Sequence, residues 1–154
     1  AELMRKGING NEIIDKTYYE KTYIQNQILG RALLESMLIM DKKCIVSVIR
    51  QKSMEFFQAK PSDLEGIVSQ LRLTKGVEVA IFLHELSPQK FKVSLRSKGK
   101  VDVSEIAKFY GGGGHVRAAG VTMEGSSHDV INNITARIAL QLKHEHEEEQ
   151  VGEQ

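Results

Sequence analysis

Gly111-Gly112-Gly113-Gly114-His115 is the run that gives the most information about this 154-residue chain. Glycine loses more conformational freedom on folding than any other residue. A folded domain therefore keeps four in a row where the backbone takes positive φ or closely approaches another group. Gly111 can simply end a helix in the left-handed region, with a surface loop after it. Alternatively, the bare N–H groups can cradle an anion such as phosphate. We favour the cradle because His115 follows the glycines directly.

Two common glycine-rich phosphate loops are not present in this run. A Walker loop would continue with Gly-Lys and then Ser or Thr. A dinucleotide fingerprint would place its third glycine where Val116 and Arg117 stand. The sequence therefore disfavours P-loop nucleotide hydrolases and dinucleotide-dependent oxidoreductases.

A predicted strand before the glycines carries the second candidate feature. Residues 91–98 alternate between apolar and polar side chains, which predicts one face on the core and one polar face. A solvated sheet edge protected by lysine would show the same pattern. Arg96 favours a binding face, because its planar guanidinium can hold a phosphate through two hydrogen bonds. Ser94 and Lys98 share this face and are weaker candidates.

The whole pattern predicts an α/β domain with a mixed sheet of about five strands. These strands are expected at residues 37–41, 44–50, 77–84, 91–97 and 119–124, the first two forming a hairpin. Helix-start signals stand at Thr22, Ser62, Asp102 and Ser126. Two connector helices, one over Asn11–Glu20 and one from Thr22, are expected to precede the sheet.

Composition points to an ordinary globular domain. No stretch is apolar enough to span a bilayer and no signal-peptide pattern is present, so we expect a cytoplasmic protein without a membrane partner. All 21 Lys and Arg lie at or before Lys143, whereas five of the 20 acids follow it. This bias suits a nucleotide or a short strand better than a long duplex. Cys44 and His84 are expected to be structural, and the acidic residues 144–154 to be a disordered tail rather than a metal site.

Several segments together resemble the DHH-associated domain, the C-terminal half of DHH-type phosphoesterases. They are Arg96-Ser97, the helix start Asp102–Ala107, the run Gly111–His115 and the segment Arg117–Gly120. The resemblance covers about residues 35–142 and is strongest to bacterial oligoribonucleases, many of which also dephosphorylate 3′-phosphoadenosine 5′-phosphate (pAp).

The resemblance implies a role for each matching residue. Arg96 and Ser97 would contact a substrate phosphate or terminal nucleotide. The backbone of Gly111, Gly112, Gly113 and Gly114 would cradle phosphate, and His115 would line the cleft between domains. The expected ligand is therefore pAp or a short RNA.

The resemblance also implies that the catalytic centre lies elsewhere. Such enzymes hold two Mn²⁺ ions on Asp and His residues of an N-terminal DHH domain. This chain has no Asp-x-Asp and no Asp-His-His, and it does not begin with Met. We therefore expect residues 1–35 to be the end of a DHH domain with its connector, and residues 36–143 to bind substrate. By itself the chain should bind no metal and be inactive. Its DHH domain would be its partner, with a homodimer through that domain as a further option.

Other functions would use the same residues. A c-di-AMP phosphodiesterase has this domain with the same glycine motif, usually behind membrane and sensory segments. A non-catalytic RNA-binding module, like that of alanyl-tRNA synthetase, would bind through the same basic strand. A pure interaction domain would show no phosphate affinity. Chain-length preference, RNA against DNA, and oligomeric state stay open at this point.

Overall fold

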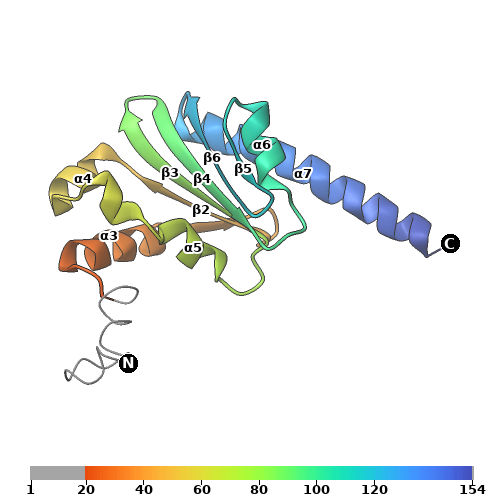
Figure 1. The fold of residues 1–154 in the computed structure, drawn as a ribbon, viewed down its shortest axis with the longest axis horizontal. Helices are drawn as coiled ribbons and strands as arrows, with labels where there is room; N and C mark the ends of the chain where they lie inside the picture. The colour runs from red at the N-terminus through yellow and green to blue at the C-terminus, as the bar shows by residue number, and fades with distance from the viewer. Residues whose placement is uncertain (1–19, 154) are drawn as a thin grey trace, which may run out of the picture.

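A six-stranded mixed sheet forms the centre of residues 20–153, the part of the chain that the computed structural model describes (Figure 1). The strands are β1 (Met37–Ile39), β2 (Cys44–Ile49), β3 (Val79–Ser87), β4 (Lys90–Ser97), β5 (Gly113–His115) and β6 (Ala118–Glu124). Their order is β1-β2-β3-β4-β6-β5. Only β2 and β3 pair in parallel, and the other neighbours are antiparallel. The predicted α/β class is confirmed. The extra strand, β5, is formed by part of the glycine run.

Helices lie on both faces of the sheet (Figure 1). They are α3 (Tyr23–Leu34), α4 (Gln51–Phe57), the 3₁₀ turn η2 (Pro61–Leu64), α5 (Ile67–Arg72), α6 (Val103–Phe109) and α7 (Ser127–Gly152). One core lies between the sheet and α6 and α7, and it takes up Phe91, Val93 and Leu95 of β4 as the alternation predicts. The second core lies under α3, η2 and α5 and takes its sheet residues from β2 and β3 alone. The helices of this second layer therefore leave β6 and β5 uncovered on that face, and only α5 reaches β4, which it faces across a pocket.

Three of the predicted helix starts are confirmed. Thr22 and Gln25 form the expected capping box, with each side chain accepting from the other residue's N–H. The Asp102 carboxylate caps α6, and the Ser126 hydroxyl accepts from the N–H of Asp129 at the start of α7. The fourth is wrong. Residues around Ser62 form η2 instead, and α5 begins only after Gly66, whose φ of 85° interrupts the helical path.

Two strand predictions are wrong by two or more residues at an end, the other three differ by one residue, and one helix was missed. The first strand stops at Ile39 because Met40, Asp41 and Lys42 all take positive φ in the hairpin turn. The third runs over residues 79–87 rather than 77–84. Helix α4 was not predicted. In the helix predicted over Asn11–Glu20, residues 11–19 lie outside the described residues.

The acidic end of the chain is helical, so the prediction of a disordered tail is wrong for residues 144–152. Helix α7 runs without a break from Ser127 to Gly152 and extends past the sheet (Figure 1). The segment from Lys143 to Val151 contains no Gly or Pro and is rich in Glu, a good helix former. None of the described helices combines the length and apolar character needed to cross a membrane.

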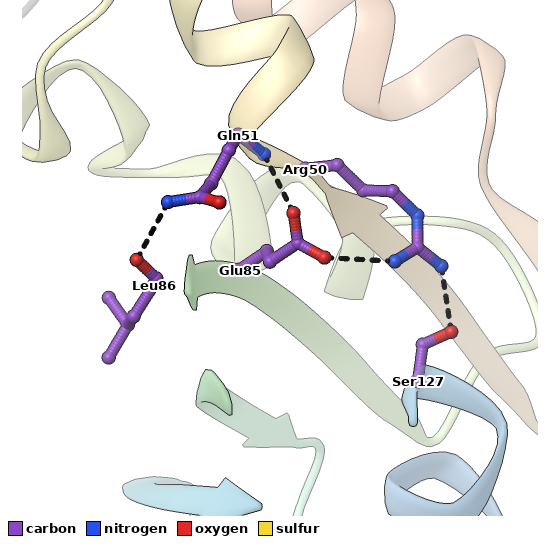
Figure 2. A network of polar contacts seen from close by, with 5 residues as sticks. All are labelled: Arg50, Gln51, Glu85, Leu86 and Ser127. Atoms are coloured by element: carbon purple, nitrogen blue, oxygen red, sulfur yellow. Dashed lines mark hydrogen bonds and ion pairs between the residues drawn. The ribbon is translucent and has the colours of Figure 1, made fainter. Parts of the chain in front are cut away.

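A polar network ties the ends of β2 and β3 to the start of α7 (Figure 2). Arg50 donates to the Glu85 carboxylate at 3.1 Å and to the Ser127 hydroxyl at 2.8 Å. Gln51 donates its backbone N–H to Glu85 at 3.1 Å and its amide to the Leu86 carbonyl at 2.9 Å. Both carboxylate oxygens of Glu85 therefore accept hydrogen bonds within this network.

Candidate functional site: an uncovered basic face of the sheet

Arg96 and His115 share one row of the sheet. Arg96 on β4 lies opposite Ala118 on β6, and Ala118 lies opposite His115 on β5. Residues directly opposite each other in neighbouring strands project from the same face. With strands about 4.8 Å apart, the backbones of Arg96 and His115 are roughly 10 Å apart. The structure thus places the two principal candidates on the same face, with one small residue between them.

The next row continues this arrangement. Ser94 lies opposite Gly120, which in turn lies opposite Gly113. The residues of β6 between the two margins are therefore Ala118 and Gly120, and both are only half-buried because none of the described helices covers them. We call this feature the trough: a floor of Ala118 and Gly120, with Arg96 and Ser94 on one margin and His115 and Gly113 on the other.

Ser97 and Lys98 lie outside the trough. Ser97 faces the core, is fully buried, and donates its hydroxyl to the Val101 carbonyl at 2.6 Å. Lys98 is exposed just beyond the end of β4. This hydrogen bond from Ser97 stabilises the turn that leads to α6. The resemblance gives it a substrate contact, which stays a prediction without geometric support here.

At least two of the four glycine N–H groups already have partners. Gly111, at a φ of 90°, donates to the Lys108 carbonyl at 3.0 Å, and Gly112 donates to the Ala107 carbonyl at 2.7 Å. This pair of bonds is a Schellman motif, which ends α6. The use of Gly111 as a helix stop is therefore confirmed, and a cradle made from all four N–H groups does not fit this geometry.

Close packing against β6 explains why positions 112 and 114 of the run are glycines. A Cβ on Gly112 would stand 2.3 Å from the Gly120 carbonyl oxygen, and one on Gly114 would stand 2.5 Å from the Ala118 oxygen. Neither position can hold a side chain unless the backbone moves. Gly113 differs, because nothing lies within 4 Å of where its Cβ would be. Among these four residues, Gly113 is thus the glycine that borders the trough without a packing reason to be bare.

Backbone hydrogen bonds hold His115 in place. At the tip of the β5–β6 hairpin, the Val116 carbonyl accepts from the N–H of Val103 at 2.9 Å. The Arg117 carbonyl accepts from the N–H of Ser97 at 3.0 Å. The hairpin is therefore fastened to the end of β4 and the start of α6, which fixes the row that contains Arg96 and His115.

A pocket of about 220 Å³ adjoins the trough. The sequence analysis did not assign two of its lining residues, His84 and Lys92, to a binding site. Arg96, Ser94, Lys92 and His84 line its sheet side, and η2 and α5 form the opposite wall with Pro61, Glu65 and Gly66. His84 was expected to be structural. Its place follows from the β3–β4 register, in which it lies opposite Lys92. The shared parity of Ala80, Phe82 and His84 along β3 was the available signal.

The charges of this face are not neutralised by ion pairs among residues 20–153. Within this described range, the guanidinium of Arg96 donates only to the Leu95 carbonyl, at 3.0 Å. Burial, and then the nearby charge of Arg72, lowers the pKa of Arg96, although arginine stays protonated at neutral pH. Burial, followed by the charge of Lys92, also lowers the pKa of His84. The face therefore carries positive charge that an anionic ligand would stabilise.

The described residues offer no metal centre. Nowhere in residues 20–153 do three or more His, Cys, Asp or Glu side chains gather closely enough to hold an ion. The assignment of two Mn²⁺ ions to a DHH domain stays a prediction.

Residues 41–144 match the sequence profile of the DHHA1 domain, and this range includes the trough and the pocket. The chain belongs to the DHHA1 domain family. The resemblance inferred from Arg96, the glycine run and Arg117–Gly120 is thereby confirmed. The chain is accordingly a phosphoesterase-associated domain.

Known relatives are much longer than this DHHA1 chain. It is 43% identical over 63 residues to the bifunctional oligoribonuclease and PAP phosphatase NrnA of Thermus thermophilus, a match covering 41% of the chain and 19% of NrnA. It is 23% identical over 142 residues to a membrane protein–large ribosomal subunit bL9 fusion protein of Aster yellows witches'-broom phytoplasma, covering 92% of the chain and 16% of that protein. The aligned part is therefore less than a fifth of either relative.

Two solved structures share the fold. An exopolyphosphatase-related protein from Bacteroides fragilis superposes with a TM-score of 0.75 at 25% identity, over 90% of this chain and 41% of that one. The DHH domain of a member of a family of ribosomal proteins superposes with a TM-score of 0.51 at 20% identity, over 85% of this chain and 35% of that one.

Proposed function

We propose that this DHHA1 domain is the substrate-binding part of a cytoplasmic, metal-dependent phosphoesterase that degrades short oligoribonucleotides, pAp or both. One observation carries the proposal: Arg96 and His115 share a row on an uncovered sheet face, separated by Ala118. The similarity to an oligoribonuclease and PAP phosphatase supports this substrate class.

Each residue of the trough has a simple task in this proposal. Arg96 offers two parallel N–H donors that match a phosphate, and His115 donates from the opposite margin. Ala118 and Gly120 keep the floor low, so that a phosphate can lie between them. Activation of water and stabilisation of the developing phosphoryl charge would be supplied by metal ions on the expected DHH domain. The residues described here position the substrate.

Calorimetric titration tests this assignment. pAp and a triribonucleotide are titrated into the 154-residue chain and its Arg96→Ala, Arg96→Lys and Lys108→Ala variants. We expect high-micromolar to millimolar dissociation constants for the parent and about tenfold or greater loss for both Arg96 variants, since lysine lacks the planar fork. Lys108 is the matched control, because it is exposed on α6 at the opposite face of the sheet. Equal losses in the Arg96 and Lys108 variants would reject the trough as the binding site.

A c-di-AMP phosphodiesterase is the second candidate. The similarity to a phytoplasma membrane protein over 92% of the chain favours it, because such phosphodiesterases usually carry membrane segments upstream. Titration with c-di-AMP separates the two candidates. Binding at least tenfold tighter than that of pAp would favour the cyclic dinucleotide.

A further inference from the structure

The pocket beside the trough contains a second cationic side chain, Lys92, in addition to Arg96. Lys92 and His84 lie directly opposite each other in the antiparallel β3–β4 pair, so their Cα atoms are about 5 Å apart. Both side chains line the pocket together with Ser94 and Arg96. This places the ammonium of Lys92 beside the imidazole of His84, which burial and Lys92 itself keep neutral at pH 7, with the guanidinium of Arg96 farther along the strand.

The carboxylates near this pair do not neutralise it. Among residues 20–153, neither Lys92 nor His84 forms an ion pair. Glu85, the next residue on β3, is bound to Arg50 and Gln51. Glu65 belongs to the opposite wall and is itself exposed. His84 is only 8% exposed and has no acidic partner among these residues, so its neutral imidazole is a hydrogen-bonding group on the pocket wall.

We infer that His84, Lys92 and Ser94 form a second phosphate subsite, which takes another phosphate of a substrate whose first phosphate lies between Arg96 and His115. The inference rests on the proposed function. Lys92 and Arg96 are four residues apart on β4, or roughly 13 Å between Cα atoms, and their long side chains can shorten this span. Two phosphates on one ribose, or on consecutive nucleotides, could then be held along one strand.

Size and chemistry favour phosphate over a nucleobase in this pocket. Its volume of about 220 Å³ is small for a nucleoside but sufficient for a phosphate. A base would be expected to stack on an exposed aromatic ring, whereas Phe82, the aromatic residue of this lining, is only 4% exposed. An ammonium, an imidazole and a hydroxyl all donate to phosphate oxygens.

Comparison of a bisphosphate with monophosphates tests the subsite. pAp, 5′-AMP and 3′-AMP are titrated into the 154-residue chain and its Lys92→Gln, His84→Gln and Lys90→Gln variants, with folding checked by circular dichroism. The parent should bind pAp at least about tenfold more tightly than either monophosphate. Lys92→Gln should lose most of this preference, by weakening pAp about tenfold while the tighter monophosphate changes less than twofold. His84→Gln should shift the preference in the same direction.

Lys90 is the matched control, because it is an exposed lysine two residues away on the same strand and outside the pocket lining. Lys90→Gln should leave the preference for pAp unchanged. If Lys90→Gln and Lys92→Gln reduce it equally, the effect is one of general charge and the subsite is rejected. If Arg96→Ala abolishes binding while Lys92→Gln keeps the full preference, the subsite is rejected and the proposed function stands. If the parent binds none of the three nucleotides, both the subsite and the proposed function are rejected.

Discussion

Alanine at Gly112 and at Gly113 should have opposite consequences, although the two residues are neighbours. A Cβ at Gly112 would meet the Gly120 oxygen at 2.3 Å and the Val121 Cβ at 2.6 Å, so β5 or β6 must move by about an ångström. Overpacking of this kind costs about 1–3 kcal/mol, and contact with backbone puts Gly112→Ala near the upper end. For a domain of this size, that corresponds to a fall in Tm of roughly 5–10 °C.

Gly113→Ala meets nothing within 4 Å, so its Tm should stay within about 2 °C of the parent. Its methyl group would instead enter the trough and weaken pAp binding. The measurement is thermal unfolding by circular dichroism at pH 7.5, followed by titration of pAp well below the lowest Tm. Equal, small Tm changes in both variants would refute the claim that the glycine run is shaped by its contact with β6. Unchanged affinity in Gly113→Ala would remove this residue from the trough.

Three further predictions concern groups outside the binding face. Asp102→Ala should cost about 1 kcal/mol at pH 7 through loss of the α6 cap. The hydrogen bond from the Ser104 hydroxyl is the main cause that lowers the pKa of Asp102, so this stabilisation is present above the unfolded pKa of about 3.9. The difference in Tm between parent and variant should therefore close as the pH falls through the lowered value, and a constant difference down to pH 2 would contradict this. Arg50→Ala, which breaks the network in Figure 2, should lower the stability by about 1 kcal/mol without changing pAp affinity, and loss of affinity would show that the network and the trough are coupled. Burial, with a smaller effect of Glu78, raises the pKa of Cys44 to about 12. A thiol reagent should therefore label Cys44 only after unfolding, and rapid labelling of the folded protein would contradict its burial.

Local chemistry made much of the fold predictable. The alternation along β4 depends only on which side chains avoid water, and it placed Arg96 on the correct face. The caps at Thr22, Asp102 and Ser126 satisfy N–H groups within a few residues, so their signals are contained in short segments. The family resemblance likewise rested on contiguous motifs.

The missed features depend on contacts between distant segments. Glycine has low strand propensity, so β5 could not be read from its own residues. It forms because Gly112 and Gly114 allow the backbone to lie against β6. His84 gains its proposed binding role only through its register with Lys92. The acidic end was judged by its charge, whereas helix propensity and continuity with α7 decided its structure.

The central claim is that the uncovered half of the sheet, with Arg96 and His115 in one row, binds phosphate. Nuclear magnetic resonance tests it most directly, by following the backbone amide signals of the ¹⁵N-labelled chain as pAp is added up to millimolar concentration. The account predicts that the largest changes cluster at Ser94, Arg96, Gly113 and His115, with little change in α7. Changes centred on α6 and α7, or no change at any amide, would contradict it.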